Sequence, residues 1–229
     1  MFSKYNITAR IYPAIICSIP IFVLNYFLLS NYTSGLINSL EKIKWIGGIT
    51  FSVALTFLLA QLGRFIGKEL FEKTHFNDEL RMPTTNILLH SNSLYSPEHT
   101  DRIHSKILVD FGIQVFSAKQ EEKDVAAARR TIAESVSMIR AKVGNGQLLL
   151  QHNTEYGFAR NLVGGSVPAL YMSVVNLYIF GVIFPNSTAY FISIFTSIAY
   201  FLLVLMGKQI IDRYGMSYAK ILVQEYLIC

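Results

Sequence analysis

The chain has 229 residues, of which 52% are hydrophobic and 15% are charged, and its mean hydropathy is positive. These values depart from those of soluble globular proteins, and the net charge of +5 is spread in short patches, which favours membrane orientation over nucleic-acid binding. Its two cysteines, Cys17 and Cys229, exclude a disulfide framework and a CxxC metal site, so the composition indicates a membrane protein.

Two uncharged runs open the chain. The first covers residues 11–29, and this length is close to the ~20 residues that a spanning helix needs. A signal peptide is the alternative, because a basic start precedes the run, but Pro13 and Pro20 interrupt it and no A-x-A-like site follows. The second run, residues 45–62, begins with Trp45 at a boundary position. Residues 1–62 are therefore expected to form a membrane hairpin.

A polar insert, residues 63–160, separates this hairpin from the next hydrophobic region. It holds 13 of the 20 Lys and Arg residues, 12 of the 15 Asp and Glu residues and all five histidines. Gly63 and Gly67 form a GxxxG pattern at its start, which permits close helix approach but is weak evidence when it occurs once. The insert is large enough to form its own small core.

The insert is expected to be mostly helical. Residues 86–90 are either a short strand or a packed loop, and a helix can start at Ser96 or Pro97. The clearest helix is residues 118–143, where apolar residues recur every three or four positions until Gly144. This stripe is interpreted as an intramolecular core, with a subunit seam as the alternative.

Residues 161–206 are expected to form a second membrane hairpin, with spans at 167–184 and 188–206 joined by a turn at Pro185. The tail, residues 207–229, is amphipathic and lies either along the membrane surface or against the insert. Lys and Arg near the span ends gather on one side, so both termini and the insert are expected in the cytoplasm, with the protein multi-pass in the inner (plasma) membrane. The predicted fold class is an all-α membrane protein with four transmembrane helices in two hairpins and a mostly helical cytoplasmic insert.

The sequence lacks the motifs of common catalytic and cofactor sites, so no enzyme and no cofactor is predicted. His99 and His104 are five positions apart and fall on different faces of a helix, which argues against a metal site. Basic residues of two predicted helices are instead candidates to bind a phosphate-bearing ligand, with a solvated mixed surface as the alternative. These candidates are Arg102, His104, Arg129, Arg130 and Arg140.

Uncharged polar residues lie within the predicted spans. Ser173 and Asn176 share a helix face near the middle of the third span, and Asn25 lies in the first. Such side chains must face protein or water, so they either form interhelical hydrogen bonds or line a pore. No Asp, Glu, Lys, Arg or His lies within the spans, which disfavours a proton-coupled transporter.

Three stretches, residues 9–14 (ARIYPA), 83–90 (PTTNILLH) and 156–162 (YGFARNL), resemble small multi-pass membrane proteins of prokaryotic defence islands. The most similar type is the membrane effector of nucleotidyltransferase-linked anti-phage systems such as Hailong. The resemblance implies a homo-oligomeric channel that a nucleotide or DNA-oligomer product of a soluble nucleotidyltransferase holds closed or opens. Opening would depolarise the inner membrane and stop growth of the infected cell.

The resemblance also indicates residues that could couple the insert to the spans. They are Arg10, Pro83, Thr84, Thr85, His90, Tyr156, Gly157, Arg160 and Asn161. Arg10 and Arg160 fall at the expected membrane boundary, where an interfacial anchor is the simpler interpretation. The prediction is an oligomeric membrane effector, an ion channel or pore gated through the insert, and the alternative is a non-conducting scaffold that recruits a soluble partner.

Overall fold

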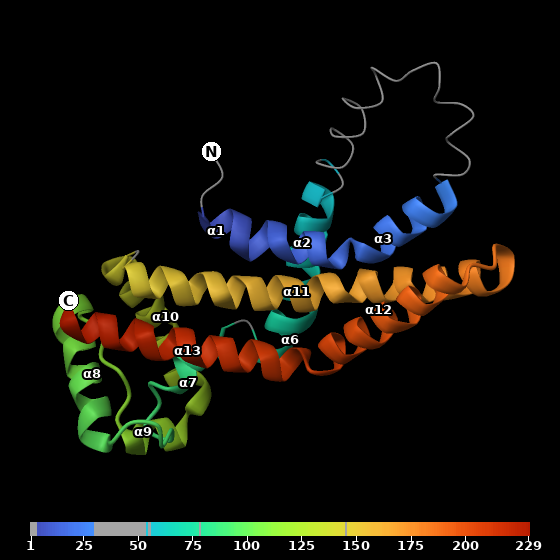
Figure 1. Ribbon diagram of the computed structural model, residues 1–229. Coiled ribbons are helices and arrows are strands. Elements are labelled where there is room, and N and C mark those ends of the chain that lie inside the picture. The colour runs from blue at the N-terminus through green and yellow to red at the C-terminus, as the bar shows by residue number, and fades with distance from the viewer. Residues whose placement is uncertain (1–3, 30–53, 55, 78, 145) are drawn as a thin grey trace. The chain divides into compact units, whose positions relative to one another are not determined.

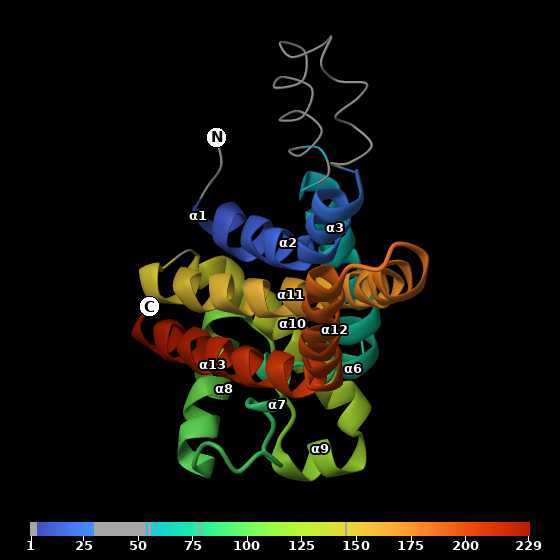
Figure 2. The same cartoon turned by 45° about the vertical axis from the view of Figure 1, so that its right-hand side comes forward.

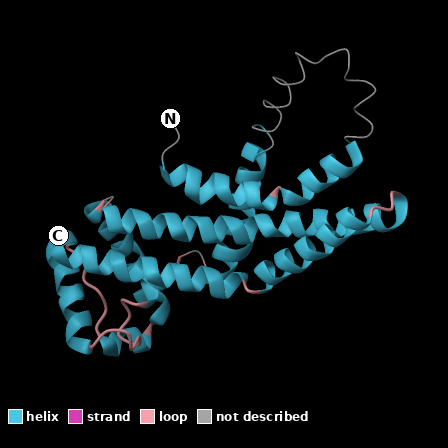
Figure 3. Cartoon of the chain, in the orientation of Figure 1, coloured by secondary structure: helices cyan, strands magenta, loops and turns pink. Residues whose placement is uncertain are grey.

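A computed structural model describes residues 4–29, 54, 56–77, 79–144 and 146–229. In this part of the chain 85% of the residues are helical and no strand is present, which confirms the all-helical class (Figure 3). The chain divides into two compact units. Unit 1 comprises Met1–Phe71 and Gly157–Lys208, and unit 2 comprises Glu72–Tyr156 and Gln209–Cys229.

The first segment of unit 1 is a bent helix. Its pieces are α1 (Lys4–Asn6), π-helical η1 (Ile7–Ile11), α2 (Tyr12–Cys17), α3 (Ile19–Leu24) and π-helical η2 (Asn25–Leu29). The bend of 41° lies at Ser18, between α2 and α3. Pro20 explains the break, because proline has no backbone N–H and its ring collides with the carbonyl group four residues earlier. The expected span 11–29 is therefore a broken helix.

The longest helix is α11 (Gln147–Tyr178), which continues as π-helical η4 (Ile179–Ile183) and is followed by α12 (Ser187–Leu205) (Figure 1). The stretch Gln147–Ile183 and α12 are each long and apolar enough to cross a membrane, and the bent first helix makes a third candidate. The predicted span 167–184 thus lies inside a helix that begins twenty residues earlier. Most of the predicted span 45–62 lies outside the described residues, although residues 56–62 are helical.

Four glycines bring two segments of unit 1 into backbone contact. A Cβ atom on Gly164 of α11 would overlap the backbone of Gly63 and of Gly67. On the other side of α11, a Cβ atom on Gly165 would lie 2.8 Å from the Cys17 sulfur. The GxxxG pattern at positions 63 and 67 therefore marks a close approach between helices that a larger side chain would prevent.

Unit 2 is built from short helices around one apolar core. Its helices are α6 (Thr74–Phe76), α7 (Pro83–Asn86), α8 (Pro97–Phe111), α9 (Ala118–Lys123), α10 (Val125–Val143) and most of α13 (Gly207–Ile228), preceded by π-helical η3 (Gly67–Lys73) at the unit boundary (Figure 2). Ile103 and Ile107 of α8, Ile139 of α10 and Tyr226 of α13 are fully buried together. The tail therefore packs into the core of unit 2, one of the two placements that the sequence left open.

The helical part of the insert agrees with the sequence except at one break. Ser96 caps α8 by accepting the backbone N–H of His99, which confirms the predicted start. The predicted helix 118–143 is wrong as a single helix, because Asp124 leaves the helical conformation and its carboxylate caps α10 at the N–H of Ala127. In α10 the middle of the apolar stripe is buried in the unit's own core, as expected.

Residues 86–90 are the packed alternative and not a strand. Pro83 and Asn86 bound the short α7, and tight turns follow to His90. Ile87, Leu88 and Leu89 are at most 2% exposed, so three successive side chains enter the core. Three successive buried side chains fit a packed turn and not a strand, in which successive side chains point to opposite faces.

Candidate functional site

The first helix of unit 1 carries two prolines, and each leaves a backbone carbonyl without its helical partner. In an α-helix the carbonyl of residue i accepts the N–H of residue i+4. Pro13 therefore cannot serve the carbonyl of Ala9, and Pro20 cannot serve that of Ile16. A buried carbonyl without a hydrogen bond costs several kcal/mol in apolar surroundings. Such a carbonyl therefore needs another donor.

Side chains from α11 and α12 satisfy both carbonyls. Asn161 Nδ2 donates to Ala9 O at 2.6 Å, and the Tyr200 hydroxyl donates to Ile16 O at 2.6 Å. A third bond joins Asn176 Nδ2 to Pro20 O at 2.7 Å. We call Asn161, Asn176 and Tyr200 the carbonyl caps. Each is at most 3% exposed. The bonds to Ala9 and Ile16 replace helix hydrogen bonds inside the packed unit, whereas the bond to Pro20 is an additional one.

Other polar atoms of the same unit are buried without a described partner. In the described part of the chain, Ser173 Oγ, Asn176 Oδ1 and Ser197 Oγ are shielded from solvent and form no hydrogen bond. Ser173 and Asn176 lie three residues apart on α11, so they share a face as the sequence predicted. Unpaired buried polar atoms are rare in proteins and call for a functional or hydration role.

The predicted pore-lining residues do not share one environment. Ser173 and Asn176 are buried against the protein, and the Asn176 amide is used by Pro20. Asn25 instead lies on η2 with an exposed side chain. Within one chain, Asn176 therefore forms an interhelical hydrogen bond, which is the simpler of the two interpretations.

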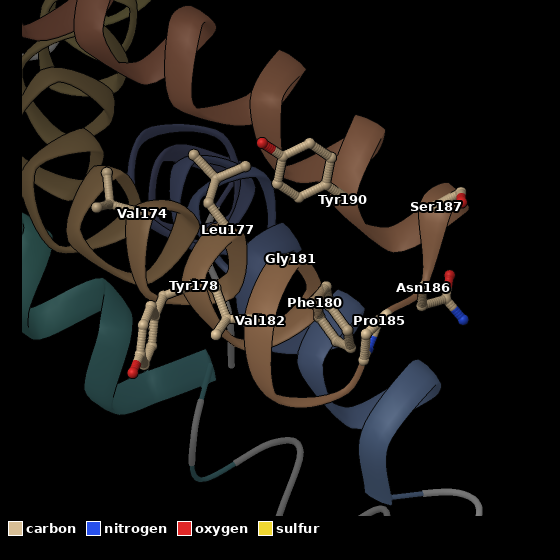
Figure 4. A pocket seen from close by; sticks show the side chains of 10 residues that line it. All are labelled: Val174, Leu177, Tyr178, Phe180, Gly181, Val182, Pro185, Asn186, Ser187 and Tyr190. Atoms are coloured by element: carbon tan, nitrogen blue, oxygen red, sulfur yellow. The ribbon is translucent and has the colours of Figure 1, made fainter.

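A hollow of about 550 Å³ lies at the turn between η4 and α12 (Figure 4). Three of its ten lining residues are aromatic, with Tyr178 and Phe180 on one side and Tyr190 on the other. The Tyr190 ring lies against Gly181, where a Cβ atom would approach it to 3.0 Å. Aromatic rings at the tip of an apolar hairpin are typical of the boundary between bilayer and water.

Two of the predicted ligand-binding arginines hold a chain segment of unit 2 instead of an open site. Arg129 donates to the carbonyl oxygen of Leu80 at 2.9 Å and to the side chain of Asn86. Arg140 donates to Thr84 Oγ1 at 3.3 Å and lies 3.8 Å from the Glu79 carboxylate. Both therefore fasten residues 79–86, the segment that contains the predicted coupling element.

The remaining ligand candidates differ in exposure. Arg102 and Arg130 point to solvent, so the structure leaves them on the surface. His104 is half-buried and its Nε2 lies 2.7 Å from the carbonyl oxygen of Leu88, to which a proton on Nε2 is donated. Burial lowers the pKa of His104, although the bond to Leu88 acts in the opposite direction. The five candidates thus do not form one basic cluster.

The predicted coupling residues of unit 2 are mostly structural. Pro83, Thr84 and Thr85 are buried in α7, and Thr85 donates to the backbone carbonyl of Glu79 at 2.9 Å. Glu79 has a φ of +75°, a conformation that residues other than glycine rarely adopt. The hydrogen bond from Thr85 therefore stabilises a strained turn immediately before α7.

His90 and Tyr156 also hold their neighbours. The backbone N–H of His90 donates to Glu121 at 2.8 Å, and that of Ser91 donates to the second carboxylate oxygen at 3.0 Å. The Tyr156 hydroxyl donates to the Glu72 carboxylate at 2.9 Å. Glu121 is only 2% exposed, so a charged side chain replaces the missing partners of two backbone groups.

The coupling residues assigned to unit 1 surround the first helix. A Cβ atom on Gly157 would lie 3.1 Å from that of Ala9, and Asn161 binds the Ala9 carbonyl. The Arg10 guanidinium lies 5.8 Å from the centre of the Tyr5 ring. Arg160 lies beside Asn161, with a long contact of 3.5 Å to its amide oxygen, and a Cβ atom on Gly67 would meet the Arg160 backbone. Of these residues, Gly157 and Asn161 contact the bent helix directly.

Sequence reasoning missed two side chains that hold the backbone, Tyr200 and Glu121. Tyr200 looked like one of many apolar aromatic residues, although Pro20 signals that some donor must serve Ile16. Glu121 looked like a solvated acid next to Glu122 in a helix of alternating charge. Among the described residues no three His, Cys, Asp or Glu side chains are grouped as metal ligands. Comparisons with protein families, with characterised proteins and with solved structures found no match to this chain.

Proposed function

We propose that the chain is a membrane effector in which unit 1 lies in the bilayer and several copies form a gated ion path. Unit 2 is its cytoplasmic control domain. The observation that carries this proposal is the proline-broken first helix, held by the three carbonyl caps. Broken helices at membrane depth occur where they are buried in protein or line a water-filled cavity, and moving parts of transport proteins are built in this way.

Three side-chain hydrogen bonds can hold the first helix in one position and still allow it to move to a second one. Each bond joins a side chain of α11 or α12 to a backbone atom of the first helix, so a shift of that helix breaks the bonds without unfolding either partner. Neutral amides and hydroxyls can exchange one such bond for another, or for water, at a cost of about 1 kcal/mol each. The unpaired atoms of Ser173, Asn176 and Ser197 supply the alternative partners.

The charge distribution supports the orientation of this effector. Lys and Arg near the ends of the apolar stretches fall on the side of unit 2 and of both termini, which favours the cytoplasm for all three. The resemblance to defence effectors extends the proposal to its setting: opening depolarises the inner membrane of an infected bacterium. A nucleotide or oligonucleotide made by a partner enzyme, or the partner itself, is the proposed signal to unit 2.

Membrane potential tests the proposal in bacteria that express the chain beside its genomic neighbours during phage challenge. A voltage-sensitive dye should report depolarisation for the natural chain and for Tyr190→Phe, a matched variant on the exposed face of α12. Asn176→Leu should abolish it, because the change removes both the cap and the polar atom Oδ1. The amount of protein in the membrane fraction is measured for every variant.

Depolarisation that survives Asn176→Leu unchanged would remove this residue from the ion path. Protection with a steady potential would favour the second candidate, a non-conducting membrane anchor whose unit 2 recruits a soluble partner. One observation favours the anchor: Asn176 is buried within a single chain and its amide binds the Pro20 carbonyl, so its polarity has a structural use.

A further inference from the structure

Unit 2 contains a cleft of about 520 Å³ between α8, α9 and the loop that joins them. Its volume falls within the range of sites for small organic molecules. His90 and His104 form the inner end, and Leu108 and Phe116 line an apolar wall. The cleft lies wholly inside unit 2, so its chemistry is independent of how unit 1 works.

The inner end is built by well-packed groups. The ring of His90 stands edge-on to that of His104, with centres 4.7 Å apart. His104 is fixed by its bond to Leu88, and the backbone of His90 is fixed by Glu121 from α9. Burial lowers the pKa of His104 and favours the uncharged ring, and in that form the donation from Nε2 to Leu88 leaves Nδ1 as an acceptor.

The charge of the lining has one sign. Among the described residues no Lys or Arg lines the cleft, and Asp101 is the one lining residue with a permanent charge. The Asp101 carboxylate is 69% exposed and lies 3.9 Å from His90 Nδ1, so it stands at the mouth without a strong partner of its own. Behind the wall, the buried Glu121 adds a second negative charge. An anion entering here would meet the Asp101 carboxylate, whereas a cation would meet no described lining residue of its own sign.

We propose that this cleft binds a small organic cation, with an amine at Asp101 and an aromatic or aliphatic body along Leu108 and Phe116. The ammonium group pairs with the carboxylate at the mouth, and the face of Phe116 adds a cation–π or stacking contact. At the inner end, an imidazole nitrogen of the histidine pair accepts a hydrogen bond from a polar group of the ligand. The predicted phosphate-bearing ligand of unit 2 would need a different surface.

A charge-matched series of probes tests the proposal on the full chain in detergent micelles. Tyramine, 4-ethylphenol and 4-hydroxyphenylacetate share a phenol ring and differ in carrying a positive, zero or negative charge. Saturation-transfer NMR and calorimetry should give tyramine a Kd below about 1 mM and at least about tenfold tighter binding than either other probe. Asp101→Asn should remove this preference, whereas Glu98→Gln, an exposed acid of α8 outside the cleft, should leave it unchanged.

Equal binding of the three probes, binding of none, or undiminished tyramine binding in Asp101→Asn would each overturn the proposal. Tighter binding of 4-hydroxyphenylacetate would also overturn it and would indicate that the cleft prefers anionic ligands. Because Asp101 is on the surface, helix content and thermal unfolding of the variant should match those of the natural chain. The assay requires no ion flux, so its failure is distinguishable from failure of the proposed membrane function.

Discussion

The two units solve the same problem, a backbone group without a partner, with different chemistry. In unit 1 the carbonyls that the prolines leave unpaired are served by uncharged side chains, Asn161 and Tyr200. In unit 2 the unpaired groups are served mainly by ionisable ones: Glu121 accepts two N–H groups, and Arg129 donates to a carbonyl. The difference agrees with the proposed placement of unit 1 in the bilayer, because burying a charge in hydrocarbon costs far more free energy than placing it at the edge of a domain in water.

This contrast teaches that the two units respond to different conditions. Neutral hydrogen bonds in an apolar environment do not depend on pH or salt, whereas carboxylate and imidazole bonds do. All five histidines belong to unit 2. Acid and ionic strength are therefore expected to act on unit 2 and to leave the carbonyl caps of unit 1 in place.

The largest effect is expected from Glu121→Ala in unit 2. The change leaves the buried N–H groups of His90 and Ser91 without a partner and should lower the free energy of unfolding of unit 2 by about 3 kcal/mol or more. Hydrogen exchange followed by mass spectrometry should show faster exchange in α8 and α9. The exposed neighbour variant Glu122→Ala should stay within about 0.5 kcal/mol of the natural chain, and equal losses in the two variants would contradict the role of Glu121.

Asn161→Leu should have the next largest effect, in unit 1. It frees the Ala9 carbonyl in the packed interior and should cost about 2 kcal/mol, measured by thermal unfolding in detergent. Pro13→Ala is the second mutation of a double-mutant test, because alanine restores the N–H donor that the Ala9 carbonyl lacks. In the Pro13→Ala background the cost of Asn161→Leu should fall by about 1 kcal/mol, and strictly additive losses would show that the bond does not compensate for the proline.

Tyr200→Phe is expected to have a smaller effect, because it removes one hydroxyl and preserves the packing of the ring. The loss should be about 1 kcal/mol, and Pro20→Ala should reduce it, since alanine can serve the Ile16 carbonyl. Tyr190→Phe on the exposed face of the same helix is the matched control. A loss that is as large in Tyr190→Phe would mean that the Ile16 bond contributes nothing specific.

The smallest effect is a dependence of unit 2 on pH. His104 has a pKa below its ordinary 6.5 in the folded state, so only the unfolded chain gains a proton as the pH first falls below 6.5. Stability should therefore decrease from pH 6.5 downward until the folded His104 also titrates, and it should be constant above this window. His104→Gln should flatten this part of the curve, measured by hydrogen exchange of α8; an unchanged slope would assign the effect to another group.

Protonation of Glu121 is expected to lower the stability of unit 2 further at lower pH. Burial acts to raise the pKa of Glu121, but hydrogen bonds from the Ser91 side chain and from the backbone of Ser91 and His90 outweigh it and lower the pKa below 4.5. The stabilisation by this carboxylate is complete above pH 4.5 and disappears as the pH falls through the folded pKa. Unit 1 should show neither transition.

The sequence predicted the helical class, the start of α8 and the buried stripe of α10, because each depends on local periodicity and on a capping residue. It did not predict the break at Asp124, where one carboxylate caps a new helix within a continuous apolar pattern. The prolines predicted that carbonyls would be unpaired, but the donors Asn161 and Tyr200 lie 152 and 184 residues away in sequence. Only packing brings such distant residues together, and one sequence contains no direct signal of it.

The packing of Cys17 gives the chain a built-in reporter. Its thiol is buried beside Gly165, whereas the other thiol, Cys229, is exposed at the end of the chain. A maleimide should therefore add once per chain while the first helix is packed against α11, and twice when that helix moves away. The stoichiometry of labelling, read from the mass of the intact protein, would therefore report the proposed movement of the helix without any introduced cysteine or fluorophore.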